Sequence, residues 1–149
     1  MTEPIVRPDA PRPDAAAIRG RRQWPLPKQA DPTAPLLVVD NLSVRFSMPS
    51  GSVKAVEGVS FRLDDGEALG IAGESGCGKT TTALSLVQLL PANGRIRSGR
   101  VELFGIDLVP KTQRQLARYR WREISIVFQG AMNALNPVRR VGDQIAEPI

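Results

Sequence analysis

Apolar and polar positions alternate in the first ordered part of the chain, which predicts several short strands. Residues 36–39 are apolar, and residues 42–46 alternate in the manner of a half-buried strand. Residues 53–63 predict one or two further short strands. Two turn-forming segments, residues 48–52 and 64–66, separate these runs from their neighbours. This part of the chain is therefore expected to be rich in β-structure.

In the middle of the chain, the pattern changes from that of a strand to that of a helix across a glycine-rich stretch. Residues 67–72 form a short apolar run with the length of a buried strand. Residues 80–90 are apolar on more than one face, which predicts a packed helix of about three turns that ends before Pro91. The predicted order is strand, glycine-rich loop and helix.

The last third of the chain predicts two more strands and two more helices. Residues 98–105 form a strand bounded by glycines, and residues 124–128 form a strongly β-branched strand. Residues 112–120 predict a polar helix. Residues 141–149 begin an amphipathic helix that Pro148 interrupts. The sequence contains no internal repeat.

The N-terminal segment differs in composition from the rest of the chain. Residues 1–35 contain eight of the thirteen prolines. Such a segment buries too little apolar surface to offset the entropy lost on ordering, so a disordered tail without chemistry is expected. Residues 36–149 are expected to form the ordered domain.

Composition and charge exclude several classes of protein. The 149 residues carry a formal net charge of +5, without the concentrated basic stripe that nucleic-acid binding requires. The densest basic cluster fits a solvated helix face better, and it comprises Lys111, Arg114, Arg118, Arg120 and Arg122. A single cysteine excludes an internal disulfide framework. No segment matches a membrane span or the core of a signal peptide, so a cytosolic chain is expected.

Residues 73–80, with the sequence GESGCGKT, fit the phosphate-binding P-loop pattern G-x-x-x-x-G-K-[ST]. The glycines let the backbone curl and bring several N–H groups toward phosphate oxygens. Lys79 would reach the β- and γ-phosphates, and the Thr80 hydroxyl would complete a Mg²⁺ shell otherwise filled by phosphate oxygens and water. A helix that starts at Lys79 would direct its positive dipole end at the same anion. The pattern therefore predicts a nucleoside triphosphate site.

A bare turn and a nucleophilic cysteine both fit residues 73–80 less well than a phosphate site does. A bare glycine-rich turn would share the composition, but the predicted strand before the loop and helix after it are the context that a P-loop requires. Cys77 is not expected to act as a nucleophile, because the chain contains no histidine that could serve as its base. Its small size suits a place within the loop.

The order of Phe46, the P-loop and Gln129 along the chain resembles the ATP-binding subunit of ABC transporters. The stretches that carry this resemblance are residues 41–44 (NLSV), 55–61 (AVEGVSF), 66–81 (GEALGIAGESGCGKTT) and 126–129 (IVFQ). Residues 131–138 (AMNALNPV) look like the oligopeptide, dipeptide and nickel import branch. The resemblance covers residues 36–149. It implies an α/β fold with a P-loop NTPase core and an N-terminal antiparallel β subdomain, truncated before the signature motif.

The resemblance also implies roles for individual residues. Phe46 matches the aromatic residue that stacks on adenine, although an ordinary core aromatic is the alternative. Gln129 matches the Q-loop glutamine, which approaches Mg²⁺ and the attacking water and lies where the transmembrane subunit docks; a polar strand cap is the alternative. The implied catalytic residues are Lys79 and Gln129, and the implied metal ligands are Thr80 and Gln129. The implied nucleotide-binding residues are Phe46, Gly73, Glu74, Ser75, Gly76, Cys77, Gly78, Lys79, Thr80 and Thr81.

The implied function is binding of ATP with Mg²⁺ and, in the full-length protein, ATP hydrolysis that energises import of peptides or similar small solutes. The implied partners are transmembrane permease subunits, a second ATP-binding subunit in a homo- or heterodimer and, indirectly, an extracytoplasmic solute-binding protein, but no nucleic acid. The implied location is the cytoplasmic face of the cell membrane. One alternative is a hydrolysis-incompetent nucleotide-binding fragment. Another is an ABC-type ATPase outside transport, against which residues 131–138 argue.

Several parts of the family pattern are missing from these residues. The chain contains no LSGGQ-like signature, no apolar strand that ends in Asp-Glu, and no histidine. Phosphoryl transfer depends on positioned charge around the γ-phosphate and on an oriented water. Lys79, Thr80 and Gln129 supply only part of that arrangement. The chain is therefore expected to be an N-terminal fragment of a longer protein or a truncated gene product.

The isolated chain is expected to be marginally stable and to hydrolyse ATP negligibly. Part of a mixed sheet would expose an apolar face and an unpaired edge, and the catalytic groups named above would be incomplete. A phosphate-release assay on the purified chain measures the turnover. Robust turnover that Lys79→Ala abolishes would overturn this expectation.

Overall fold

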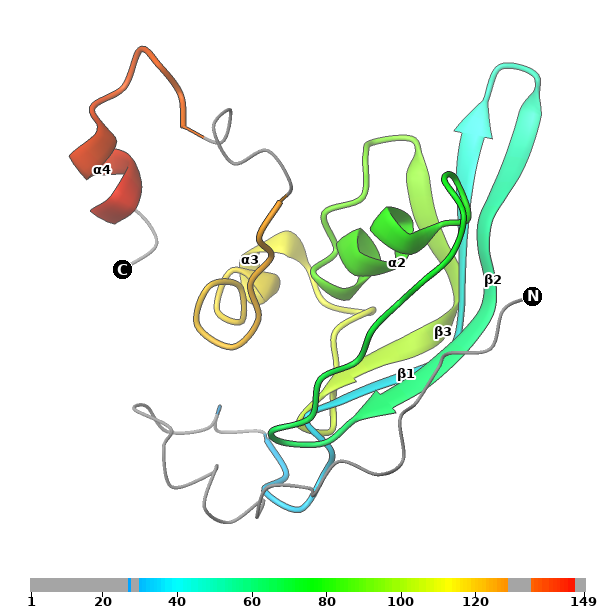
Figure 1. The fold of residues 1–149 in the computed structure, drawn as a ribbon, viewed down its shortest axis with the longest axis horizontal. Coiled ribbons are helices and arrows are strands. Elements are labelled where there is room, and N and C mark those ends of the chain that lie inside the picture. The colour runs from blue at the N-terminus through cyan, green and yellow to red at the C-terminus, as the bar shows by residue number, and fades with distance from the viewer. Residues whose placement is uncertain (1–26, 28–29, 129–134, 147–149) are drawn as a thin grey trace. The chain divides into compact units, whose positions relative to one another are not determined.

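The computed structural model describes residues 27, 30–128 and 135–146, which belong to two compact units. The first unit ends at Lys111, and the second begins at Thr112. The first unit contains a four-stranded sheet and the helix that follows the glycine-rich loop (Figure 1). The described residues thus combine strands and helices, as the predicted α/β class requires.

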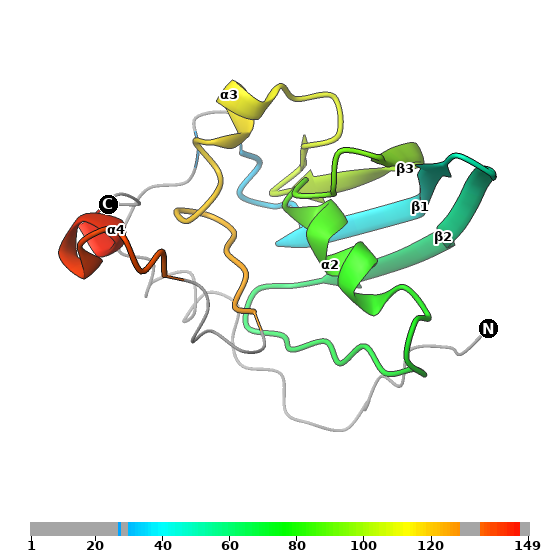
Figure 2. The ribbon, with the colours of Figure 1, turned by 90° about the horizontal axis from the view of Figure 1, so that it is seen from above.

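The sheet is antiparallel and has the strand order β2-β1-β3-β4. The strands span Leu37–Met48 (β1), Gly51–Leu63 (β2), Gly94–Leu103 (β3) and Ile106–Asp107 (β4). β1 and β2 form a long hairpin, with its turn inside the segment 48–52 that the sequence predicts as a turn. Helix α2, Lys79–Leu86, lies over one face of the sheet (Figures 1 and 2).

The central strand β1 contains a β-bulge near Asn41. Before the bulge Leu37 and Val39 are buried, and after it Leu42 and Val44 are buried. The pairing of β1 with both neighbouring strands shifts register over the same part of the strand. Because successive side chains of a strand point to opposite faces, the extra residue keeps the apolar residues of both halves on one face. The apolar residues 36–39 and the alternating strand predicted over residues 42–46 therefore contribute to one bulged strand.

Contacts from both neighbouring strands hold the bulge. Asn41 has a φ of 49°, in the left-handed region, and its N–H donates to Ser60 Oγ of β2 at 2.8 Å. A Cβ at Gly99 of β3 would lie 2.5 Å from the Asn41 carbonyl oxygen. Arg100, which follows Gly99, donates to the carboxylate of Asp40 at 2.8 Å. The bulge is therefore a fixed feature of the sheet.

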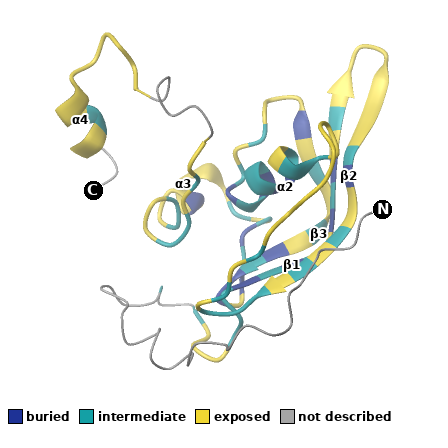
Figure 3. Ribbon diagram, viewed as in Figure 1, coloured by how far each residue is buried: buried dark blue, intermediate teal, exposed yellow. Residues whose placement is uncertain are grey.

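The core of the first unit follows the central strands and extends past the end of β3. Leu42, Val44 and Val101 are fully buried. The other buried apolar residues of this unit are Leu37, Val39, Val56, Val87, Leu103, Phe104, Ile106 and Leu108. The tip of the β1–β2 hairpin is exposed instead (Figure 3). The covered face of the sheet thus supplies most of the hydrophobic stabilisation.

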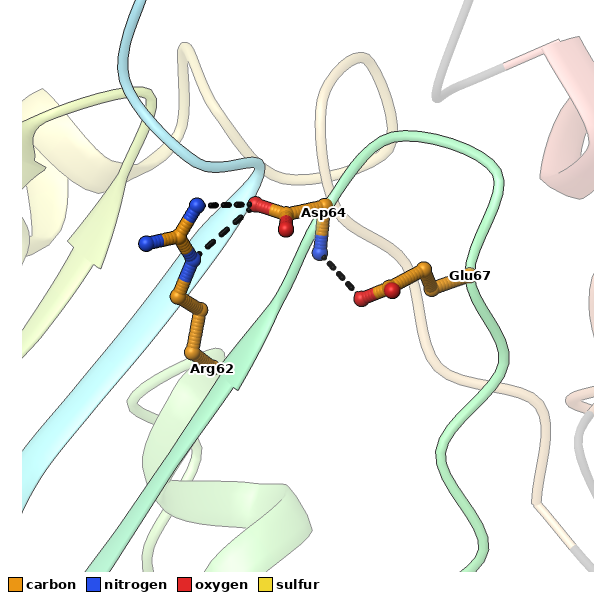
Figure 4. A network of polar contacts seen from close by, with 3 residues as sticks. All are labelled: Arg62, Asp64 and Glu67. Carbon is orange, nitrogen blue, oxygen red and sulfur yellow. Dashed lines mark hydrogen bonds and ion pairs between the residues drawn. The ribbon is translucent and has the colours of Figure 1, made fainter. Parts of the chain in front are cut away.

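A polar turn at the end of β2 redirects the chain toward the glycine-rich loop. Arg62 donates to Asp64 Oδ1 from Nε at 3.0 Å and from Nη2 at 2.8 Å (Figure 4). The N–H of Asp64 donates to the Glu67 carboxylate at 2.9 Å, and the N–H of Glu67 donates to the Asp64 carbonyl at 3.1 Å. This reciprocal pair closes the turn predicted at residues 64–66.

Two elements around the loop differ from the sequence prediction. The strand predicted over residues 67–72 is wrong: the backbone there is irregular, and Ile71 is 47% exposed. An apolar run becomes a buried strand only when neighbouring strands form backbone hydrogen bonds with it. No strand in the described part of the chain pairs with residues 67–72. The helix predicted over residues 80–90 starts at Lys79 but ends at Leu86. Gln88 then adopts a left-handed φ of 50°, which the helix cannot continue through.

The second unit contains two short helices within the described ranges. Helix α3, Gln113–Leu116, is shorter than the polar helix predicted over residues 112–120. It begins with a capping box in which the Thr112 hydroxyl accepts from the Gln115 N–H and the Gln115 side chain accepts from the Thr112 N–H. Helix α4 is Val141–Ala146. None of the helices in the described ranges is long and apolar enough to span a membrane.

The strand predicted over residues 124–128 is also wrong. The structure has an isolated bridge between Arg120 and Ile124, and irregular backbone follows. Val127 is 91% exposed. β-Branched composition favours a strand only where a neighbouring strand and a packed face are present.

The described part of the N-terminal segment attaches to the turn between β3 and β4. The N–H of Asp31 donates to the Phe104 carbonyl at 3.0 Å, and the N–H of Phe104 donates to the Leu36 carbonyl at 3.1 Å. Most of the predicted tail, namely residues 1–26 together with 28 and 29, lies outside the described residues.

Gly99→Ala is expected to destabilise the first unit by about 1–3 kcal/mol, the usual cost of a strained backbone position. Gly99 has a φ of +94°, and an added methyl group would meet the Asn41 carbonyl oxygen at 2.5 Å. Urea denaturation followed by circular dichroism measures the change. Gly70→Ala is the matched control, because a Cβ there has nothing within 4 Å. A Gly99 variant as stable as the control would show that the bulge does not require glycine.

Candidate functional site

Residues 73–78 form a tight loop that leads directly into α2. Gly76 and Gly78 have φ values of 82° and 96°, which side chains with a Cβ rarely adopt. Gly78 is also the N-cap of α2. These two left-handed glycines turn the chain sharply into the helix. Gly78 is the second glycine of the P-loop pattern, whereas Gly76 stands at one of the variable positions of that pattern.

The last glycine of the loop also lies against the backbone of β2. A Cβ at Gly78 would be 2.4 Å from the Ala55 carbonyl oxygen and 3.3 Å from Val56 Cγ2. The Ala55 oxygen belongs to a strand backbone and cannot give way without disturbing the sheet. Close packing and backbone conformation thus both require glycine at this position.

The side chain of Lys79 folds back over the loop. Its Nζ donates to the carbonyl oxygens of Gly73 and Glu74, each at 2.7 Å, and lies 3.5 Å from Cys77 Sγ. An ammonium group has three N–H donors and no acceptor, so these contacts match its hydrogen-bonding capacity. The positive charge is therefore held by the loop.

The loop also packs on itself. A Cβ at Gly73 would lie 2.6 Å from Cys77 Sγ, and the N–H of Cys77 donates to the Glu74 carbonyl at 3.3 Å. Cys77 remains exposed. A larger side chain at Gly73 would therefore force the Cys77 side chain aside.

The N-terminus of α2 is suited to an anion. No side chain caps the helix, and its first turn contains no acidic residue. The hydroxyls of Thr82 and Ser85 donate within the helix, to the carbonyls of Gly78 and Thr81 at 3.0 Å and 2.7 Å. An uncapped helix start offers its first N–H groups and the positive end of the helix dipole to an anion.

The donor set at the loop fits a metal ion that arrives with a phosphate ligand. Thr80 is exposed in the first turn of α2, and Thr81 is partly buried beside it. In the part of the chain that the structure describes, no three His, Cys, Asp or Glu residues come together as a metal site. Mg²⁺ bound through one hydroxyl, phosphate oxygens and water needs no such cluster.

Phe46 lies near the end of β1, on the same face of the strand as Val44. It is partly buried. Its cross-strand neighbours are Val53 of β2 and Gly94 of β3. The structure therefore places the predicted adenine-stacking residue in the same unit as the loop and on the sheet that supports it.

Gln129 lies outside the described residues, so its predicted place near the loop stays a prediction.

Two residues contact the candidate site although the sequence predicts no role for either of them. Ala55 receives the close approach of Gly78, and Gly94 receives the ring of Phe46. In the sequence, Ala55 has no assigned role within the stretch 55–61, and Gly94 lies outside the stretches that carry the resemblance. Their importance comes from packing between strands, which the order of residues along the chain does not show.

The glycine loop, its lysine and the helix that follows fit the P-loop pattern, although no strand directly precedes the loop in the described part of the chain. Residues 56–147 match the family model described as ABC transporter. The chain belongs to the ABC transporter family, which confirms the resemblance and the α/β fold class predicted from the sequence.

Individual relatives are similar over most of this chain. The oligopeptide transport ATP-binding protein OppD is 46% identical over 112 residues in Escherichia coli (strain K12) and 42% identical over 113 residues in Bacillus subtilis (strain 168). The dipeptide transport ATP-binding protein DppD of Bacillus subtilis (strain 168) is 43% identical over 115 residues. These alignments cover 75%, 75% and 76% of this chain. The chain spans about a third of the length of these relatives, at 33%, 32% and 34%.

Gly78→Ala is expected to detach the loop from β2, because the added methyl group would lie 2.4 Å from the Ala55 carbonyl oxygen. The N–H of Thr82, which donates to the Gly78 carbonyl at 2.8 Å, should then lose protection. Amide hydrogen exchange followed by NMR measures this as faster exchange at Thr82. Gly70→Ala serves as the control in the irregular segment before the loop. An unchanged exchange rate in the Gly78 variant would contradict the assigned contact.

Proposed function

We propose that this chain binds ATP together with Mg²⁺ through residues 73–81. The observation that carries the proposal is the position of the Lys79 ammonium, held by two loop carbonyls at the start of a helix with no side-chain cap. A cation and the uncapped N–H groups at the start of α2 complement the charge of a triphosphate. Membership of the ABC transporter family supports the same ligand.

Each residue of the loop has a separate part in the proposal. Lys79 supplies the positive charge for the β- and γ-phosphates, and its ammonium would exchange its hydrogen bonds to the loop carbonyls for hydrogen bonds to phosphate oxygens. Gly76 and Gly78 let the backbone N–H groups approach the phosphate oxygens without obstruction by a Cβ. The Thr80 hydroxyl serves as the protein ligand of Mg²⁺, and Thr81 adds a further hydroxyl for phosphate. Mg²⁺, when bound, neutralises part of the phosphate charge.

Phe46 and Gln129 extend the proposal beyond the phosphates. Phe46 offers an aromatic surface for adenine, and such stacking contributes roughly 1–3 kcal/mol per base. Gln129 offers an uncharged amide that can place a carbonyl toward Mg²⁺ and an N–H toward an oxygen of the attacking water. Lys79 and Gln129 are thus the two residues through which this chain would contribute to hydrolysis in a complete protein.

We further propose that the whole protein is the ATP-binding subunit of a peptide importer. The names of its relatives, oligopeptide and dipeptide transport ATP-binding proteins, support this substrate class. The proposed partners are transmembrane permease subunits, a second ATP-binding subunit and, through the permease, an extracytoplasmic solute-binding protein. The proposed place of action is the cytoplasmic face of the membrane.

Lys79→Ala is expected to weaken binding of ATP with Mg²⁺ by about ten- to a hundredfold. The variant loses hydrogen bonds from a charged group, which contribute roughly 1.5–3 kcal/mol. Isothermal titration calorimetry on the wild-type chain and the variant measures the two dissociation constants.

Lys54→Ala is the matched control, since it removes the same charge from an exposed ammonium that pairs with Glu57 at 2.6 Å. It should leave the dissociation constant within about twofold, because an exposed ion pair contributes little. Equal weakening in both variants would mean that net charge, and not the loop, governs binding. Absence of ATP binding to the wild-type chain would refute the proposed function.

A further inference from the structure

We propose that Gly94 is a positioning residue for base recognition: its missing side chain leaves the space in which the ring of Phe46 is held. The inference rests on the proposed function, because it assigns a role to Gly94 only if the chain binds a nucleotide. It adds a residue that no motif marks and that lies outside the phosphate loop.

The contact between the two residues follows from strand pairing. Phe46 and Gly94 are directly opposite each other on β1 and β3, so their side-chain positions share one face of the sheet. A Cβ at Gly94 would lie 2.8 Å from Cε1 and 3.2 Å from Cδ1 of the Phe46 ring. The ring therefore occupies the space that any other residue at position 94 would fill with its own side chain.

Gly94 is enclosed on its other side as well. It is buried, and a Cβ there would also lie 3.3 Å from Leu90 Cβ, in the segment that follows α2. Leu90 Cβ is attached directly to the backbone and cannot swing away, whereas the Phe46 ring can rotate about its side-chain bonds. A methyl group added at position 94 would therefore displace the Phe46 ring.

The backbone around Gly94 holds this arrangement in place. The N–H of Gly94 donates to the Pro91 carbonyl at 2.8 Å, which closes the turn 91–94. The N–H of Ser47, next to Phe46, donates to the Asn93 carbonyl at 2.8 Å, and Asn93 Nδ2 donates to the Ser47 carbonyl at 3.3 Å. The turn 91–94 is thus hydrogen-bonded to β1 at Ser47, the residue next to Phe46.

The backbone conformation at position 94 is compatible with alanine. Gly94→Ala should therefore change the position of the Phe46 ring without disturbing the folding of the sheet. Unlike seven glycines of the described chain, Gly94 does not have a positive φ. Alanine there has no unfavourable backbone conformation to adopt. The expected consequence of Gly94→Ala is therefore a moved aromatic ring on an otherwise intact sheet.

The test compares two ligands on the full 149-residue chain. ATP carries a base and phosphates, whereas inorganic tripolyphosphate carries phosphates alone. Gly94→Ala should weaken ATP binding by about three- to tenfold, because a displaced ring loses part of the binding free energy that a stacked base contributes. Tripolyphosphate binding should stay unchanged, because this ligand has no base. Calorimetric titration in the presence of Mg²⁺ gives both dissociation constants. Gly142→Ala is the control, because a Cβ at Gly142 has nothing within 4 Å.

A double variant shows whether Gly94 acts through the ring. In a Phe46→Ala background the added methyl group has no ring to displace, so Gly94→Ala should cause no further loss of ATP affinity. A loss of equal size in both backgrounds, or equal weakening of ATP and tripolyphosphate, would contradict the inference. Unchanged ATP affinity in Gly94→Ala alone would contradict it too.

Folding of the variants provides a second measure. If Gly94→Ala unfolds the chain and Phe46→Ala restores folding, the ring is the group that the methyl displaces, as inferred. Unfolding in both backgrounds would locate the conflict elsewhere and overturn the inference. Failure of the wild-type chain to bind either ligand would refute the proposed function, whereas binding that is insensitive to Gly94 would refute the positioning role alone.

Discussion

The β-bulge of β1 is the constraint on which the sheet and the candidate site both depend. A regular strand starting with Leu37 and Val39 on the covered face would also place Arg45 there and turn Phe46 to solvent. The extra residue at Asn41 reverses this alternation, so that Arg45 is exposed and Phe46 is partly buried on the core side. One inserted residue thus determines both the burial of the core strand and the face on which the aromatic side chain lies.

Three glycines allow segments of the first unit to approach each other closely, and these contacts connect the sheet with the loop and the aromatic residue. Gly99 accommodates the bulge, Gly78 lets the loop approach β2, and Gly94 makes room for the Phe46 ring. Each contact joins segments distant in sequence, and each involves β1 or its direct neighbours β2 and β3. The phosphate loop and the aromatic residue are therefore both positioned by one sheet, so a change in the sheet would move both.

The sequence predicts the parts of the fold that local chemistry determines and misses the parts that depend on partners. The start of the helix at Lys79 and the turn at residues 64–66 are correct, because glycine spacing and hydrogen-bonding side chains specify them locally. The strands predicted over residues 67–72 and 124–128 are wrong, because apolar content is not enough where no described strand pairs with them. The bulge and the contact between Phe46 and Gly94 depend on cross-strand register, which no local pattern encodes.

The segment that leads from β2 to α2 is held at its two ends and is exposed between them. The turn between Asp64 and Glu67 fixes the chain where it leaves β2, and the contact of Gly78 with Ala55 fixes it again where α2 begins. Between them the backbone is irregular and mostly exposed, so the sheet contributes little to its order. The hydrogen bonds from the Lys79 ammonium to the loop carbonyls join the loop to itself and reduce the entropy that an anionic ligand would otherwise have to remove. The lysine of the P-loop thus orders the loop as well as supplying its positive charge.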